Sequence, residues 1–193
     1  MQHRLIVCAV ALLLCACAQQ PHGGVSIAGG SVWPLLTPAQ LQAPAQALQT
    51  VEVRAGDHAA AFLFFLEADA VRLTLVSTTP DGTELFRLLQ SGENIEQRTA
   101  PFLPKQMQPR AVLADLQMAF APLDIVQRNL SATDIVVSER ADNEGRTRIY
   151  RKKNKPLVTV HCATTNCWNG KVELQNHAWN YRYVVAPIEI MFR

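Results

Sequence analysis

A cysteine near the start of the chain lies in a sequence typical of covalent lipid attachment. Leu14-Cys15-Ala16-Cys17 fits the bacterial lipobox, in which a branched apolar residue and a small residue precede the cysteine whose thiol takes the lipid. It follows Arg4 and an uncharged run from Leu5 to Leu14, the layout of a secretory signal. That run is about half of the roughly 20 residues needed to cross a hydrocarbon core. We therefore expect a signal peptide over residues 1–16 and lipidation of Cys17.

The residues after Cys17 indicate the membrane that holds the anchor. Ala18 and Gln19 follow, rather than an aspartate that would favour retention in the inner membrane. We expect a lipid-anchored protein at the outer membrane that faces the periplasm. The alternative is an ordinary secretion signal that contains unmodified cysteines.

A second pair of cysteines, Cys162 and Cys167, is separated by only five positions. In an oxidising compartment two such thiols are expected to form a disulfide, and closing so short a loop stabilises a domain by about 2 kcal/mol. His161 and His177 lie nearby and have the residue type for zinc, but the spacing fits no standard zinc finger. We predict a structural disulfide, with free thiols or a metal site as alternatives.

Sequence signatures of catalysis are missing. The serines lie in no Gly-x-Ser-x-Gly motif, and the sequence has neither a glycine-rich phosphate loop nor a helical pair of metal-binding histidines. His58 follows Asp57 in a predicted turn, where such a pair is more often solvated than catalytic. The formal net charge of +2 favours no particular class of partner. We expect a protein that is not an enzyme and has no cofactor and no bound metal.

Basic residues concentrate in one predicted hairpin. Near an anionic lipid surface each of them would contribute about 1 kcal/mol to binding. The reading that we favour is a solvated sheet edge, where lysines discourage sheet-to-sheet association. A nucleic-acid partner is not expected, because no aromatic platform is interleaved with the charges. The residues are Arg146, Arg148, Arg151, Lys152, Lys153 and Lys155.

Short apolar runs separated by turn residues predict strands, and the tight turns favour antiparallel neighbours. A helical segment with apolar residues at helical spacing interrupts them, and the order of strands, helices and strands predicts an α+β fold with one antiparallel sheet. Residues 17–31 are small, polar and rich in glycine, so we expect a flexible tether before a single domain over 32–193. The predicted strands are 51–54, 60–67, 71–77, 84–90, 135–138, 147–151, 157–161, 171–174, 181–185 and 188–192, and the predicted helices begin at Pro38 and span 110–120 and 123–130.

One strand is apolar on both faces. Phe62 to Leu66 contains no polar residue, so this strand needs cover on two sides or a ligand on one. Together with the next strand and the helix it supplies side chains that could line a cavity for acyl chains. The alternative is an ordinary packed core. The candidate lining residues are Phe62, Phe64, Leu66, Leu73, Leu75, Leu113, Leu116 and Phe120.

The stretch from Arg72 to Leu85, RLTLVSTTPDGTEL, followed by Leu113 to Gln117 and Phe120 to Pro122, resembles the LolA/LolB-like outer-membrane lipoprotein family. It is still more similar to an uncharacterised lipoprotein family found beside aryl polyene biosynthesis genes. The resemblance implies a single strongly curved antiparallel sheet, an unclosed barrel, with a helical lid over an apolar cavity. It also implies binding of acyl chains rather than catalysis.

One turn departs from the pattern of that family. Where LolB presents an exposed leucine that helps to push cargo into the membrane, this sequence has Pro80-Asp81-Gly82. An aspartate is costly to insert into a bilayer. We therefore expect the apolar cavity of the family and a membrane-facing turn at these residues, but not the lipoprotein-inserting activity.

The resemblance implies a function in lipid handling. We expect a lipoprotein that binds a lipid or lipidated cargo, for example an aryl polyene lipid, and assists its transfer to the outer membrane from a periplasmic carrier or an inner-membrane transporter. The alternative is a non-catalytic accessory lipoprotein that docks an envelope transporter or assembly complex.

Overall fold

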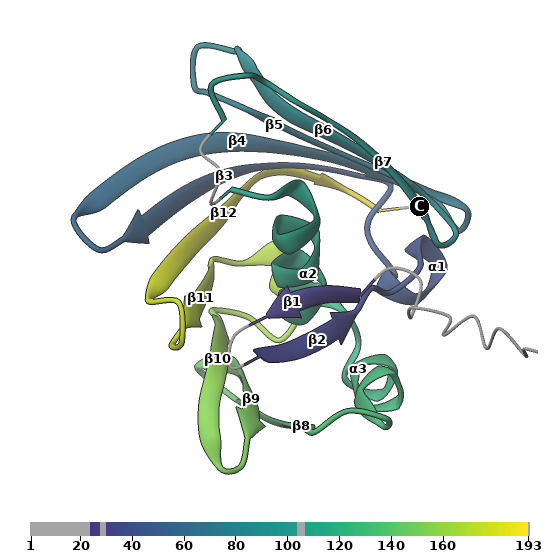
Figure 1. Cartoon of the computed structure of the whole chain (residues 1–193), viewed down its shortest axis with the longest axis vertical. Helices are drawn as coiled ribbons and strands as arrows, with labels where there is room; N and C mark the ends of the chain where they lie inside the picture. The colour runs from purple at the N-terminus through teal and green to yellow at the C-terminus, as the bar shows by residue number, and fades with distance from the viewer. Residues whose placement is uncertain (1–23, 28–29, 104–106, 193) are drawn as a thin grey trace, which may run out of the picture.

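A computed structural model describes residues 24–27, 30–103 and 107–192 of the chain. A single antiparallel sheet of ten strands dominates it, in the order β7-β6-β5-β4-β3-β12-β11-β10-β9-β8. The sheet curves around helix α2, and its edge strands β7 and β8 do not pair with each other (Figure 1). The predicted unclosed antiparallel sheet is therefore confirmed. Its strands are β3 (Gln46–Ala55), β4 (His58–Ala68), β5 (Arg72–Thr78), β6 (Glu84–Ser91), β7 (Asn94–Thr99), β8 (Ile135–Asp142), β9 (Gly145–Lys152), β10 (Lys155–Cys162), β11 (Val172–Asn176) and β12 (Tyr181–Met191).

Strand β4 shows how the sequence determines which face of the sheet is buried. Phe64 and Leu66 point into the core, whereas Phe65 between them is 37% exposed on the outer face. The apolar run is thus covered on one side only, and its outer face stays accessible to solvent. Gly56 has a φ of 57° and closes the two-residue turn that joins β3 to β4.

Helix α2 (Pro109–Phe120) lies inside the curve of the sheet, and most of its residues are buried (Figure 1). Pro109 occupies the first helical position, and the residues from Ala121 to Pro122 leave the helical conformation. Helix α3 (Leu123–Leu130) follows and packs against β8. The short helices α1 (Pro38–Leu41) and η2 (Cys167–Asn169) complete the described helical segments.

The N-terminal part of the described chain forms a hairpin. Strand β1 (Gly24–Ile27) pairs with β2 (Ser31–Pro34), and Ile27 and Trp33 are buried in the core. The expectation of a flexible tether was therefore wrong for the described residues before 32. Val25 and Ile27 alternate with small residues, and this pattern suits a short strand in spite of the surrounding glycines. Residues 1–23, including the expected cleavage site and Cys17, lie outside the described residues.

Two strand predictions differ from the structure for identifiable reasons. The segments 181–185 and 188–192 form one continuous strand, β12, whose register shifts between Pro187 and Glu189. Proline has no N–H to donate to the ladder, so it disturbs the pairing without ending the strand. Strand β7 was not predicted, because this edge strand is mainly polar and has no apolar alternation.

Candidate functional site

An open groove lies between the β3–β4 hairpin, the start of β12 and the first turn of α2. Its volume is about 550 Å³, within the range of roughly 300–1,000 Å³ that is typical of small-molecule sites. Small side chains keep it open on two sides, since Ala59 and Ala60 come from β4 and Ala111 from α2. The larger lining residues are mostly apolar or aromatic and include Val53, Phe62, Met107, Trp179, Tyr181 and Tyr183.

A smaller hollow continues from this groove beneath α2. Val112 and Tyr183 line both spaces, so the two adjoin. The hollow measures about 30 Å³, which leaves room for about one water molecule. Its walls are almost entirely apolar, and its polar lining comes from Gln49, Asp115 and Tyr183.

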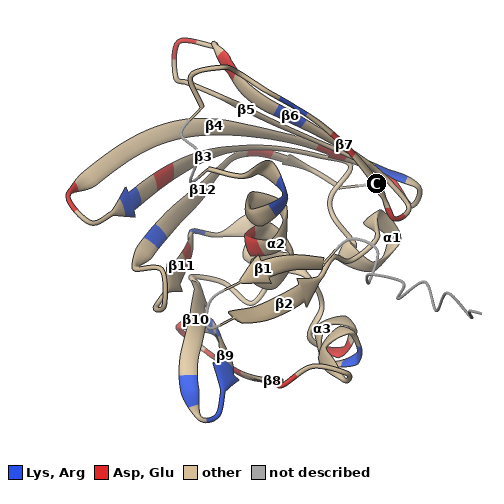
Figure 2. Cartoon of the chain, viewed as in Figure 1, with Lys and Arg blue, Asp and Glu red and all other residues tan. Residues whose placement is uncertain are grey.

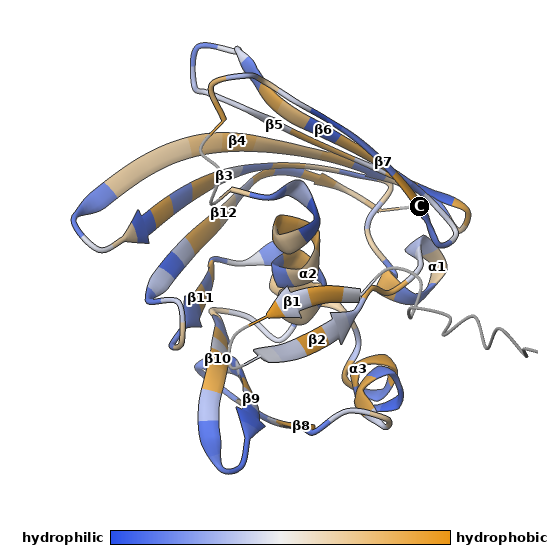
Figure 3. Cartoon of the chain, viewed as in Figure 1, coloured by the Kyte–Doolittle hydropathy of each residue, from blue (hydrophilic) through white to orange (hydrophobic). Residues whose placement is uncertain are grey.

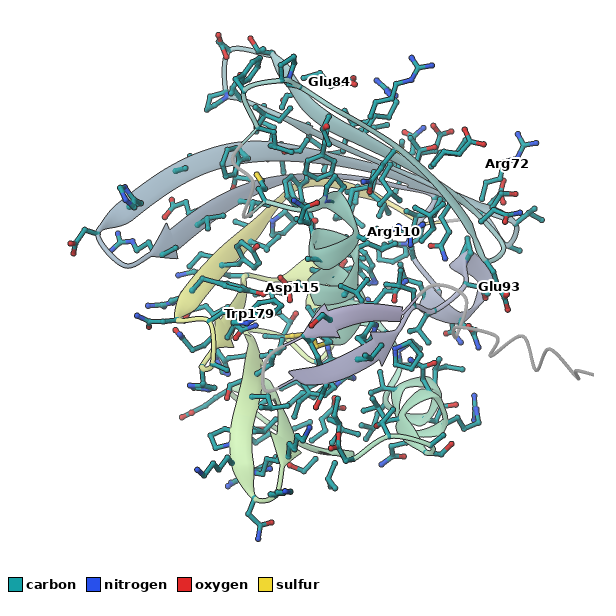
Figure 4. All side chains as sticks on the ribbon, in the orientation of Figure 1. Arg72, Glu84, Glu93, Arg110, Asp115 and Trp179 are labelled. Atoms are coloured by element: carbon teal, nitrogen blue, oxygen red, sulfur yellow. A yellow bond between two sulfur atoms is a disulfide. The ribbon has the colours of Figure 1, made fainter. Side chains whose placement is uncertain are left out.

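The aspartate cluster consists of Asp115 on α2, Tyr181 and Tyr183 on β12, and Asn176 on β11. The Tyr181 hydroxyl donates to Asp115 Oδ2 at 2.7 Å and accepts from Asn176 Nδ2 at 3.1 Å. Figure 4 shows Asp115 on the side of α2 that faces β11 and β12. Asp115 is only 5% exposed, so the cluster is a buried polar site in apolar surroundings.

Burial shifts the proton equilibria of this cluster. Burial raises the pKa of Asp115 to about 7, and the hydrogen bonds from Tyr181 and Tyr183 offset only part of that rise. Burial and the neighbouring Asp115 also raise the pKa values of both tyrosines above their usual range. Within the described ranges no lysine or arginine forms an ion pair with Asp115. Its charge is therefore balanced only by hydrogen bonds.

The arginine cluster, made of Arg146, Arg148, Glu139 and Tyr150, lies at the C-terminal end of α2. Arg148 Nη1 donates to the carbonyl oxygens of Met118 at 3.1 Å and Ala121 at 2.8 Å, and its Nε lies 2.6 Å from Glu139 Oε2. The Tyr150 hydroxyl donates to Met118 at 2.7 Å, and Arg146 Nη2 donates to the Ala119 carbonyl at 2.6 Å. These donors satisfy carbonyl groups that a helix end leaves without partners and complement its negative pole.

This cluster corrects the interpretation of the basic hairpin as one solvated charged region. Arg148 is fully buried and the Arg146 side chain is only 11% exposed, so neither forms part of a solvated edge or a headgroup surface. Lys152 pairs with Asp134 at 2.8 Å. The basic colour at the β9–β10 turn in Figure 2 belongs to the remaining exposed members. Burial raises the pKa of Tyr150 to about 12, so this hydroxyl stays protonated at physiological pH.

The candidate cavity residues divide into three groups. Phe62 lines the groove, and the inner hollow is lined by Phe64, Leu116 and Phe120. Phe120 also stacks on Trp168, with 4.0 Å between the ring centroids. The remaining four are buried in the core and line neither space: Leu66, Leu73, Leu75 and Leu113.

The turn Pro80-Asp81-Gly82 joins β5 to β6 and is exposed. The Thr79 hydroxyl donates to Asp81, and the Thr83 N–H donates back to Thr79 Oγ1 at 3.1 Å. The bond from Thr79 holds the pKa of the Asp81 carboxyl below its usual value. Gly82 adopts a φ of 90°, which few other residues tolerate. Asp81 thus organises this turn.

The predicted disulfide is present between Cys162 and Cys167, with 5.3 Å between their Cα atoms. It joins the end of β10 to η2. His161 bonds to Thr147 at 3.1 Å and His177 bonds to Thr159 at 2.8 Å. The two thiols considered as zinc ligands are therefore bonded to each other.

The sequence reasoning did not identify the aspartate cluster or the tyrosines of the groove. Asp115 carries one signal, because it is the only acidic residue in the mainly apolar helix from Pro109 to Phe120. Tyr181 and Tyr183 alternate on a predicted strand and must share a face. Nothing in the sequence brings that face to Asp115, since α2 and β12 meet only in the folded chain.

Comparisons with solved structures give distant likenesses. A domain from Vibrio parahaemolyticus, provisionally named an outer membrane lipoprotein-sorting protein domain, superposes with a TM-score of 0.42 and 10% identity over 79% of this chain and 86% of that domain. A DUF1329 family protein from Desulfovibrio piger superposes with a TM-score of 0.29 and 7% identity over 80% of this chain and 88% of that protein. A comparison with curated proteins gives no match.

No described helix has the length and apolar character needed to cross a membrane.

A family of proteins matches residues 46–189, a segment that runs from the start of β3 almost to the end of β12 and makes up well over half of the chain. The chain therefore belongs to the family described as "Protein of unknown function (DUF3261)".

Proposed function

We propose that this protein binds the apolar chain of a lipid in the groove between the β3–β4 hairpin and α2, and that its role is binding rather than catalysis. The observation that carries the proposal is the groove itself, which has a volume of about 550 Å³ and a mainly apolar lining. Each Å² of apolar surface that leaves water there contributes about 25 cal/mol. Transfer of the chain to a membrane or another protein requires only an exchange of one apolar environment for another.

The character of the groove supports a chain-like ligand. Figure 3 shows hydrophobic colour along β4 and on α2, the two elements that form opposite walls. Trp179 is 47% exposed at the groove, although large aromatic side chains gain by being covered. An apolar chain that enters from solvent would cover Trp179 and Phe62 together.

The wider role that we propose rests on the sequence. Lipidation of Cys17 would hold the domain at the outer membrane on its periplasmic side, where it would receive a lipid or lipidated cargo from a periplasmic carrier or an inner-membrane transporter. The cargo that we propose from the resemblance is an aryl polyene lipid. α2 would then serve as the lid of the cavity, with the inner hollow as its end.

Two neighbouring alanines of β4 provide a matched test of the groove. Ala60 lines the groove, whereas Ala61 points to the opposite face of the same strand and is exposed. In the full chain carrying Cys17→Ser, we expect the neutral fluorophore N-phenyl-1-naphthylamine to bind with enhanced emission. Ala60→Phe should weaken this binding at least about tenfold by filling the groove.

The control variant Ala61→Phe adds the same side chain outside the groove and should leave the affinity unchanged. Circular dichroism and thermal unfolding of both variants would establish that each is folded. Equal affinities for the two folded variants, or no binding by the parent chain, would contradict the proposal.

The turn from Pro80 to Gly82 is the part of this proposal with the most specific test. We propose that it faces the membrane without inserting, because Asp81 is charged and is held in the turn by Thr79. Asp81→Leu should speed the release of bound cargo into phospholipid vesicles, since an apolar residue enters the bilayer more readily. An unchanged release rate would contradict the placement of this turn at the membrane.

A second candidate function is docking to an envelope transporter or assembly complex. The observation that favours it is a group of exposed apolar side chains at the end of β12, where Ile188 is 54%, Met191 44% and Phe192 52% exposed. Crosslinking in the native envelope, with a photoreactive residue at position 188, would give a discrete protein adduct if this surface docks a partner. A lipid carrier would give only transient protein contacts and an extractable ligand.

A further inference from the structure

The aspartate cluster lies where the groove and the inner hollow meet. Asp115 lines the hollow, Tyr181 lines the groove, and Tyr183 lines both. A ligand chain that fills the groove would therefore end beside Asp115, the only acidic side chain among the described residues that line either space. Helix packing alone does not explain an aspartate here, because an apolar residue would fit the surrounding walls without the cost of burying a carboxyl group.

The carboxyl group of Asp115 has unused capacity to accept hydrogen bonds. An ionised carboxylate offers about four lone-pair sites. Among the described residues its donors are the hydroxyls of Tyr181 and Tyr183. About two acceptor sites remain. A donor that arrives with a ligand would reach them through the hollow that Asp115 lines.

The described charged and titratable groups around Asp115 leave its charge uncompensated. β12 presents Tyr181 and Tyr183, β11 presents Asn176, and β3 contributes Gln49 to the same hollow. Arg110 belongs to α2 itself but lies five residues before Asp115, which places it about 140° away around the helix. His58 lines the groove from β4. Among the described residues, an anionic ligand group at this point would meet a negative or neutral acceptor rather than a cation.

We propose that Asp115 selects the polar group of the bound chain and accepts a hydrogen bond from an uncharged hydroxyl, as in a fatty alcohol or a hydroxylated acyl chain. This inference rests on the proposed function. A carboxylate is disfavoured, because it would place two acceptors side by side without a proton between them. A protonated amine is a poorer fit than a hydroxyl, because burying an ammonium group costs far more than burying a hydroxyl.

The test compares two ligands with the same chain, 1-dodecanol and dodecanoate, on the full chain carrying Cys17→Ser. Each ligand displaces N-phenyl-1-naphthylamine at pH 8.5, and the ratio of the two dissociation constants is recorded. Asp115→Asn keeps the size of the side chain and an accepting oxygen but adds an N–H donor. We expect this variant to bind dodecanoate at least about tenfold more tightly than the parent chain and to bind dodecanol within about threefold of it.

Asp124→Asn makes the same substitution at an exposed position of α3, where the Asp124 side chain is 65% exposed, and it should leave both affinities unchanged.

A second measurement needs no variant at Asp115. Between pH 8.5 and pH 6 the parent chain should bind dodecanoate more tightly as the pH falls, because a protonated Asp115 can donate to the carboxylate. Its affinity for dodecanol should change little over the same range.

The outcomes separate this inference from the proposed function. The first outcome is that the parent chain and folded Asp115→Asn both bind the probe and give the same ratio of dissociation constants for dodecanol and dodecanoate. This result would overturn the selection by Asp115 but leave the groove as a lipid site. A dodecanoate affinity that does not change with pH would overturn it in the same way. Absence of probe binding by the parent chain would overturn both proposals.

Discussion

The arginine cluster and the aspartate cluster both place largely buried ionisable groups against α2, but they balance the charge differently. In the arginine cluster the cations meet a carboxylate and the carbonyl groups at the end of the helix. In the aspartate cluster the donors that the described residues offer to the carboxyl are neutral hydroxyls, and the carboxyl lines the inner hollow. The first arrangement fixes the helix in the sheet, and the second leaves acceptor sites that the hydroxyl of the proposed ligand would fill.

The largest expected effect comes from removing the central cation of the arginine cluster. Arg148→Met leaves Glu139 and the carbonyl groups of Met118 and Ala121 without their partner in a buried site. Breaking one side of a buried ion pair costs about 3–5 kcal/mol. We expect a loss of that size in the free energy of unfolding, measured by urea denaturation. Arg140→Met at an 84% exposed side chain is the matched control, and a loss below about 1 kcal/mol at Arg148 would remove the structural role of this cluster.

The aspartate cluster should instead make stability depend on pH. Because the pKa of Asp115 is raised from 3.8 to about 7 on folding, the folded state retains a proton that the unfolded chain has lost. Asp115 therefore lowers the free energy of unfolding very little below about pH 4. The loss grows as the pH rises from about 4 to about 7, and it is constant above that. At about 1.4 kcal/mol per pKa unit the total is at most about 4 kcal/mol.

Asp115→Asn removes this titration while keeping the shape of the side chain. The variant should gain stability relative to the parent chain between pH 4 and pH 7, in thermal unfolding followed by circular dichroism across that range. Asp124→Asn should track the parent chain. If the difference between Asp115→Asn and the parent chain does not vary with pH, the carboxyl group is not held in the unbalanced environment described above.

The smallest effect of the three concerns the disulfide beside the arginine cluster. Arg146 Nη2 lies 3.5 Å from Cys162 Sγ, and the neighbouring Trp168 stacks on Phe120 at the end of α2. Opening a loop this short lowers the free energy of unfolding by about 2 kcal/mol. Urea unfolding with and without a reductant measures it. The double variant Cys162→Ala, Cys167→Ala is the control, and its free energy of unfolding should not change with the reductant. If the free energy of unfolding of the parent chain does not change either, the prediction is contradicted.

Local patterns were sufficient to predict most of the sheet. Alternation on β5 and the apolar run of β4 predicted strands. The turns Gly56-Asp57 before β4 and Pro80-Asp81-Gly82 after β5 predicted antiparallel pairing with β3 and β6. The disulfide followed from the spacing of Cys162 and Cys167 together with the expected oxidising compartment. These features depend on neighbours in sequence, so the sequence carries them directly.

The errors and omissions share a physical cause. Arg148 and Lys153 look equivalent in sequence, but the side chain of Arg148 alternates into the core and reaches the end of α2. Asp115 and Tyr181 are 66 positions apart and meet only because α2 crosses the inside of the sheet. Val25 and Ile27 were read as tether, because a four-residue strand is too short to show a clear period. Long-range packing decides each of these cases.

The most direct test of lipid binding is native mass spectrometry of the full chain purified from the envelope of its own host. We predict an adduct that denaturation releases as a lipid, that persists in Ala61→Phe and that is lost in Ala60→Phe. Repeated preparations in which the parent chain carries no adduct would contradict the account, as would an adduct that both variants retain equally.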